Sequence, residues 1–206
     1  MRKILAAGAA LALLAGGSAA LAQTAPAGPP VRVRATIEKV DGNTIMVKSR
    51  EGQDLTIRLA DNLRVFGMEK ITIGEVKVGN YVGVSSTPQP DGSQKAIHVH
   101  IFPDALRGVA EGHFPWDSRP GTMMTNAAVE TTVAGTDGQT LMVKYKNDEK
   151  KIIVPPEAII VKYVAGEKGE LKPGAKIFII AAQRQPDGTL QAAGVTVGRN
   201  GLTPPL

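Results

Sequence analysis

Residues 40–48 read VDGNTIMVK, and residues 136–144 read TDGQTLMVK. In both, an Asp-Gly pair separates a preceding apolar run from a threonine and an alternating apolar strand. Asp-Gly between alternating apolar runs is the strongest short-range signal for a β-hairpin. The two copies lie 96 residues apart (137 minus 41). The stretch therefore predicts a β-protein whose fold is built twice.

Two further motifs repeat at almost the same distance. EVKVG at 75–79 matches ELKPG at 170–174, and QPDG at 89–92 matches QPDG at 185–188. Three motifs in the same order, at offsets of 95 or 96, indicate an internal duplication. We expect the repeats to span residues 31–101 and 127–198.

Within each repeat the pattern favours short strands. Residues 31–37 alternate apolar and polar side chains, which is typical of a half-buried strand. No segment keeps a helical period; only single turns are expected at 104–107 and just before Gly79 and Gly174. A repeat of short antiparallel strands with glycine turns most economically closes into a small barrel, which removes exposed edges. A single two-sheet sandwich across both repeats is the alternative.

The two ends of the chain differ in sequence pattern from the repeats. Arg2-Lys3, an apolar run and Ala20-Leu21-Ala22 form the pattern of a secretory signal peptide over 1–22, with cleavage expected after Ala22. The apolar run is shorter than the roughly 20 residues that cross a bilayer, although an uncleaved anchor helix is the alternative. Residues 23–30, QTAPAGPP, predict a flexible linker, and 199–206 a C-terminal tail. We expect the periplasm as the location.

Composition narrows the classes of function. The chain has no cysteine, so no disulfide stabilises the exported protein. Without Arg2 and Lys3 there are 22 basic and 19 acidic residues, a net charge of +3. The charges are interspersed, and aromatic residues make up only 4% of the chain. This argues against a nucleic-acid partner, which needs a basic groove and stacking side chains.

The repeats resemble a family of small bacterial envelope domains of unknown function, on residues 40–47, 75–82 and 90–96 and their counterparts in the second repeat. The whole chain is similar to a group of exported alphaproteobacterial proteins that share the pattern RGxxEGHxPWDxxPGxxMTNA, here residues 107–127. The resemblance implies an all-β fold of two tandem small OB-like antiparallel barrels joined by an ordered connector, and no catalytic residues. Some members are described as metal transporter permeases. This sequence has no apolar segment after residue 22 long enough to span a membrane.

The connector, residues 102–126, holds the only tryptophan. We expect Trp116 to be buried with its N–H hydrogen-bonded, which would fix the connector between the barrels. A stacking surface for a sugar or peptide is the alternative. Nearby charged side chains would either form ion pairs that lock the loop or line a site for an anionic ligand; they are Arg107, Glu111, Asp117 and Arg119.

All three histidines lie in or just before the connector. His98 and His100 are two residues apart on a predicted strand, so their side chains point to the same side. With His113, and with Met123 and Met124, they would suit copper; with nearby carboxylates they would suit zinc or nickel. The other reading is structural: the first two histidines form the solvent face of a half-buried strand, the third braces the connector through a backbone hydrogen bond, and the methionines fill gaps.

No catalytic motif is present. The sequence lacks H-E-x-x-H, G-x-S-x-G, and the glycine-rich phosphate and dinucleotide motifs. The sequence therefore favours a non-catalytic periplasmic binding or adaptor protein, whose partner is an envelope protein or a small ligand. The adaptor hypothesis predicts an exposed apolar or charged patch beside the connector. The alternatives are a periplasmic copper- or zinc-binding protein and a hydrolase or transferase with an unrecognised site.

Overall fold

The computed structural model describes residues 28–135 and 138–206. The predicted signal peptide, 1–22, lies outside the described residues, as does most of the predicted linker. Twelve strands and three short 3₁₀ turns make up the described part of the chain, so the all-β prediction is confirmed. Among the described residues, no helix is long and apolar enough to cross a membrane.

The elements follow the predicted repeat. The first repeat contains β1 (Val31–Asp41), β2 (Thr44–Ser49), β3 (Asp54–Lys70), η1 (Ile73–Glu75), β4 (Tyr81–Pro88) and β5 (Gln94–Ile101). The connector contains η2 (Asp104–Leu106) and β6 (Gly112–Trp116). The second repeat contains β7 (Thr122–Gly135), β8 (Gly138–Tyr145), β9 (Asp148–Val154), β10 (Ile159–Ala165), η3 (Lys168–Glu170), β11 (Lys176–Arg184) and β12 (Leu190–Gly198). The three predicted single turns are the three 3₁₀ turns.

The hairpin predicted from the opening motif forms between β1 and β2, where Asp41 pairs with Thr44. Its two-residue loop begins with Gly42, whose φ is +59°. A positive φ at the first loop residue is the position at which type II′ hairpins favour glycine. The glycine therefore sets the twist that lets the two strands stay paired.

Strand partners differ from the prediction in one decisive respect. We expected residues 31–101 and 127–198 each to close on themselves, and this is wrong. β1 pairs with β11, and β3 pairs with β12 from Ile57 to Met68, so two strands of the second repeat complete the sheet of the first. Conversely, β4 pairs with β7 and β5 with β9. The repeats have exchanged their last two strands.

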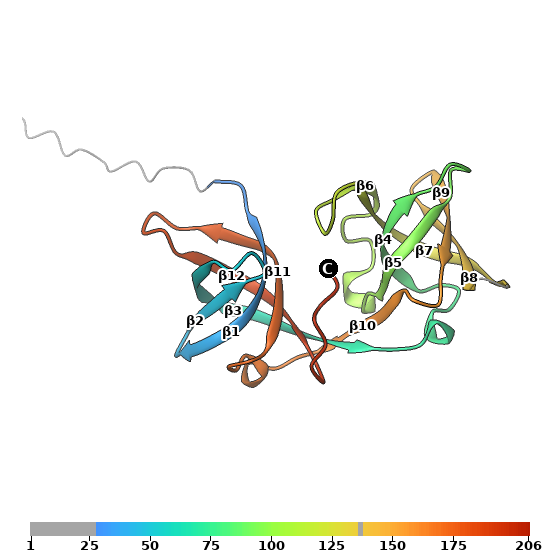
Figure 1. Ribbon diagram of the computed structural model, residues 1–206. Helices are drawn as coiled ribbons and strands as arrows, with labels where there is room; N and C mark the ends of the chain where they lie inside the picture. Colours follow the sequence, from blue (N-terminus) through green and yellow to red (C-terminus); the bar gives the residue numbers. More distant parts are fainter. Residues whose placement is uncertain (1–27, 136–137) are drawn as a thin grey trace, which may run out of the picture.

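The exchange produces two five-stranded units (Figure 1). Barrel A consists of β1, β2, the first part of β3, β12 and β11, and it closes through the parallel pairing of β3 with β12. Unit B has the equivalent strands β7, β8, β9, β5 and β4, joined at the end by two residue pairs between β5 and β9. Each unit has its own apolar core, and each core takes side chains from both repeats.

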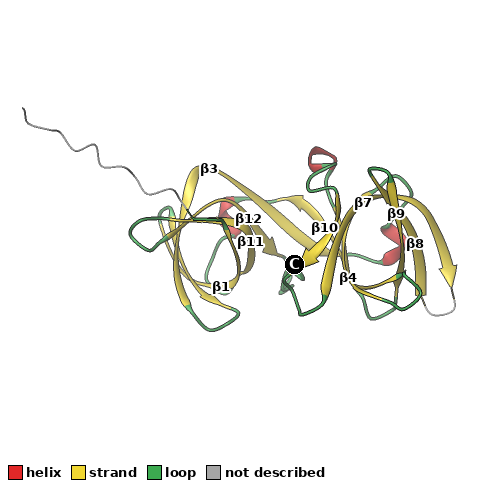
Figure 2. Ribbon diagram, turned by 90° about the horizontal axis from the view of Figure 1, so that it is seen from above, coloured by secondary structure: helices red, strands yellow, loops and turns green. Residues whose placement is uncertain are grey.

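The exchanged strands cross where β3 leaves barrel A. The second part of β3 runs on to Lys70 and pairs antiparallel with β10, Phe66 with Ala165 and Lys70 with Val161 (Figure 2). β3 is one strand along its whole length: it pairs with β2 over 54–58, with β12 as far as Met68, and with β10 from Phe66 onward. This crossing pair holds the two units side by side.

Candidate functional site

A third apolar core lies between the two units. Met68 of β3 and Val161 of β10 supply its crossing-strand side, and Phe178 of β11 comes from barrel A. The connector adds Trp116, and the C-terminal tail adds Leu206. This inter-unit core is small, but it gathers side chains from both units, the connector and the tail. The connector is therefore packed between the units, as its composition predicted.

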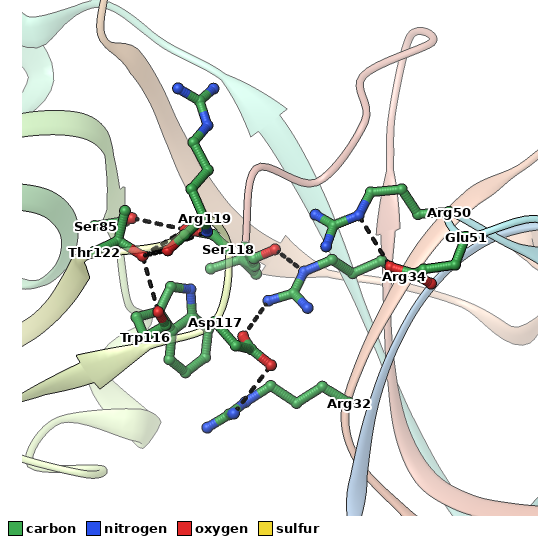
Figure 3. A network of polar contacts seen from close by, with 11 residues as sticks. Arg32, Arg34, Arg50, Glu51, Ser85, Trp116, Asp117, Ser118, Arg119 and Thr122 are labelled. Carbon is green, nitrogen blue, oxygen red and sulfur yellow. Dashed lines mark hydrogen bonds and ion pairs between the residues drawn. The ribbon is translucent and has the colours of Figure 1, made fainter.

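Asp117 fastens the connector to barrel A (Figure 3). Its carboxylate accepts hydrogen bonds from Nη1 of Arg32 at 3.2 Å and from Nη2 of Arg34 at 2.7 Å. Partial burial acts to raise the pKa of Asp117, but the hydrogen bonds and charges of the two arginines outweigh it and lower that pKa. The interpretation of a charged side chain that locks the loop therefore holds for Asp117.

Trp116 is 7% exposed and lies next to this ion pair. The guanidinium carbon of Arg32 lies 4.2 Å from the indole centroid, within the range of a cation–π contact. The prediction that the indole N–H is hydrogen-bonded is wrong, because Nε1 has no partner among the described residues. The ring is thus held by packing and by the stacked arginine; sequence alone could not foresee an arginine from β1 above it.

The remaining charged residues of the connector make separate contacts. Arg107 donates from Nη2 to the carbonyl oxygen of Gly79 at 2.7 Å. The carboxylate of Glu111 accepts the backbone N–H of Lys146 at 2.8 Å. Both therefore tie the connector to unit B. Arg119 differs, because its side chain extends away from the loop in Figure 3.

His98 and His100 are buried, at 0% and 2% exposure. They do point to the same side of β5, opposite the core residue Val99. That side is covered, in part by Tyr163, and is not the solvent face that the structural alternative predicted. Nε2 of His98 lies 3.2 Å from Nδ1 of His100. Tyr163 of β10 contacts the His100 ring edge to face.

Burial dominates the chemistry of this pair. It lowers the pKa of His98 to about 3, with a smaller contribution from the positive charge of Arg34. Burial, and then the neighbouring His98, also lowers the pKa of His100. A glycine makes room for the second ring: a Cβ at Gly83 would lie 2.2 Å from Nε2 of His100. Both imidazoles are therefore neutral at neutral pH, and Nδ1 of His98 has no hydrogen-bond partner among the described residues.

The structure does not bring the third histidine to this pair. Nδ1 of His113 lies 2.8 Å from the hydroxyl of Thr125, not from a backbone group, and its ring lies beside that of Tyr145 in unit B. Through its pairing with Thr125, His113 lies on the side of the sheet that carries core residues. His100 pairs with Gly83 and lies on the opposite side of the sheet. Residues 28–135 and 138–206 contain no group of three or more His, Cys, Asp or Glu side chains placed to hold a metal ion.

The two methionines also lie in different surroundings. Met124 is buried in the inter-unit core, and Met123, its neighbour on β7, points elsewhere and is half-buried. The gap-filling reading therefore fits Met124. The five side chains proposed as metal ligands do not form one set.

A groove of about 630 Å³ lies between the two units, beside the connector. Barrel A lines one wall, Ile97 and Ile159 from β5 and β10 line the other, and Ser118 and Arg119 come from the connector. The tail lines one side with residues 203–206, and Nε of Arg34 donates to the main-chain oxygen of Leu206. The groove is a surface beside the connector that carries both charged and apolar side chains.

Positive charge gathers on this groove. Its lining includes five basic side chains and one acidic side chain; the basic ones are Arg34, Lys48, Arg50, Arg119 and Lys176, and the acidic one is Glu38. Apolar side chains form much of the rest, among them Ile159 at 39% exposure. Sequence reasoning missed Arg34, Lys48, Arg50 and Lys176, since Lys176 comes from the second repeat and joins the other three only through the strand exchange. Arg119 was the one groove cation in the predicted set.

No protein-family model matches the chain, and no curated protein or solved structure matches it either.

Proposed function

We propose that this chain is a non-catalytic binding or adaptor protein of the bacterial envelope, and that it binds its ligand in the groove between two OB-like barrels. The observation that carries the proposal is the groove itself: its lining combines apolar side chains with five basic ones and is built by both units, the connector and the tail. Pockets of about 300 to 1,000 Å³ with mostly apolar walls and a few polar groups are typical of ligand sites. The volume of about 630 Å³ is in that range.

The OB-like assignment is supported by strand order. Counted within barrel A, with β11 and β12 as the fourth and fifth strands, the ring runs 1-2-3-5-4 and returns to 1. The third and fifth strands are parallel, and a 3₁₀ turn precedes the fourth. Unit B repeats this order with β7, β8, β9, β4 and β5. Five-stranded Greek-key barrels of this kind commonly serve as binding modules.

Nucleic acid does not suit this groove. Proteins that bind single strands combine positive charge with aromatic side chains on which bases stack. The lining of the groove contains no aromatic side chain among the described residues. An envelope protein or a small anionic molecule with an apolar part suits the walls better.

Site-specific photocrosslinking in exporting cells tests the proposal. Benzoylphenylalanine replaces Ile159 in the groove, or Ile180, which is 60% exposed on β11 and does not line the groove. The proposal expects a discrete adduct from position 159 and none from position 180. Adducts of equal yield at both positions, or none at either, would contradict it.

A further inference from the structure

The groove continues into a second hollow. A cavity of about 380 Å³ shares Ile97, Arg119 and Ile159 with it and extends it toward Thr87 and Lys95. The two hollows together form an elongated track, which runs from the β1–β2 side of barrel A across the isoleucines to the β4–β5 hairpin of unit B. A track of this shape suits an extended chain better than a compact molecule.

The basic side chains along the track differ in whether they already have a carboxylate partner. Four of these basic groups already have carboxylate partners: Arg34 with Asp117, Lys48 with Asp54, Arg50 with Glu51, and Lys95 with Glu157. Arg119 and Lys176 form no ion pair with any residue in 28–135 or 138–206. Both are exposed, and they come from the connector and β11. Two unpaired cations beside apolar side chains are therefore available to an acidic occupant.

The chain itself already places an extended segment in this groove. Residues 203–206 read TPPL, adopt no regular secondary structure and lie along one side of the groove. Pro204 and Leu206 are buried there, and the main-chain oxygen of Leu206 accepts a hydrogen bond from Arg34. Consecutive prolines favour an extended backbone. The tail shows that apolar side chains and a main-chain oxygen can be held together on this surface.

We infer that the track binds an extended acidic segment of a partner protein. Its apolar side chains would lie on Ile97 and Ile159, and its carboxylates would meet Arg119 and Lys176. In an extended chain successive side chains alternate in direction, so alternating apolar and acidic residues would meet the apolar and the basic side chains together. This inference rests on the proposed function and names the ligand class of the same groove. Binding to an anionic membrane surface instead is one outcome of the test below.

Peptide titration against the protein from Gln23 onward tests the inference. The probe is a fluorescein-labelled peptide of about ten residues that alternates Leu and Glu, followed by anisotropy. The double variant Arg119→Glu/Lys176→Glu should weaken binding about tenfold or more, since each 1.4 kcal/mol is a factor of ten. The control Lys39→Glu/Lys77→Glu makes the same change in net charge at exposed lysines outside the track and should leave binding unchanged.

Three outcomes would overturn the inference. They are equal binding of a Leu–Lys peptide, undiminished binding by the groove variant, and stronger binding to phosphatidylglycerol vesicles than to the acidic peptide. A crosslink at position 159 without acidic-peptide binding would overturn the ligand class and leave the groove as the binding site. Loss of both would overturn the proposed function as well.

Discussion

Cutting the connector distinguishes exchanged strands from two self-contained barrels. A protease site inserted after Gly108, which is exposed and where an added Cβ would meet no atom within 4 Å, would divide the chain into one half for each repeat. The strand exchange predicts that the cut protein stays a folded 1:1 complex. Tandem barrels that closed on themselves would instead yield two independently folded halves.

The magnitude follows from what the two halves share. Six of the thirteen strand pairings join one half to the other: β1–β11, β3–β10, β5–β10, β3–β12, β4–β7 and β5–β9. The first half contributes seven buried residues to the core of barrel A and five to that of unit B. At about 1.5 to 3 kcal/mol for each fully buried aliphatic side chain, separation exposes gross apolar burial on the order of 20 to 30 kcal/mol. Neither half can therefore keep its fold alone.

The assay is size-exclusion chromatography and chemical unfolding before and after cleavage. After cleavage we expect one peak at the mass of the intact protein, and an unfolding midpoint that now rises with protein concentration, because unfolding also separates the halves. The uncut insertion variant is the control and should unfold independently of concentration. Two separate peaks, each with β-sheet circular dichroism and cooperative unfolding, would refute the exchange.

The remaining predictions concern the buried histidines and the glycine beside them. Because burial lowers the pKa values of His98 and His100, the unfolded chain binds protons that the folded chain does not, so stability is complete above about pH 6.5 and is lost toward pH 3. Chemical unfolding should show a loss of about 3 kcal/mol between pH 6.5 and 5, before carboxylates titrate, and His98→Gln/His100→Thr should remove most of it; an unchanged slope in that variant would count against the prediction. Gly83→Ala should cost about 1 to 3 kcal/mol in the same assay, because its Cβ would overlap the His100 ring, whereas Gly194→Ala, with 4.0 Å to the nearest atom, should be neutral; equal effects would contradict this reading.

The sequence predicted strands well because their signals are local. Alternation at 31–37 and the hairpin glycine set which side chains face a core and where the chain turns, and both are as expected. Partner choice is different. Because the repeats carry equivalent apolar patterns, the last two strands of either repeat fit either core, and local sequence cannot tell which they join.

One detail of the sequence does bear on the exchange. Pro155-Pro156 interrupts the second repeat between β9 and β10, whereas the corresponding part of the first repeat continues unbroken as β3. The continuous β3 carries the chain out of barrel A before β4 begins, and β4 then meets β7. The continuity of β3 was not apparent, because the polar residues Asp61 and Asn62 resemble a turn.

The histidines also show that local sequence does not reveal tertiary partners. Alternation with Val99 correctly placed His98 and His100 outside the core of their own unit. The alternation could not show that Tyr163 of β10 packs against that outer face. The groove cations were missed for a related reason: Lys48 and Lys176 are 128 residues apart (176 minus 48) and become neighbours only through the exchange.

The strand exchange has a consequence for binding. In two barrels joined only by a linker, the width of a groove between them would vary with the linker. Here the crossing pair β3–β10 is continuous with β12 of barrel A and β5 of unit B, and Asp117 ties the connector to Arg32 and Arg34. The walls of the groove are therefore fixed by the same hydrogen bonds that form the sheets. A site that is already in its binding shape loses little conformational entropy when it is occupied, which favours the binding of a flexible acidic segment that must itself become ordered.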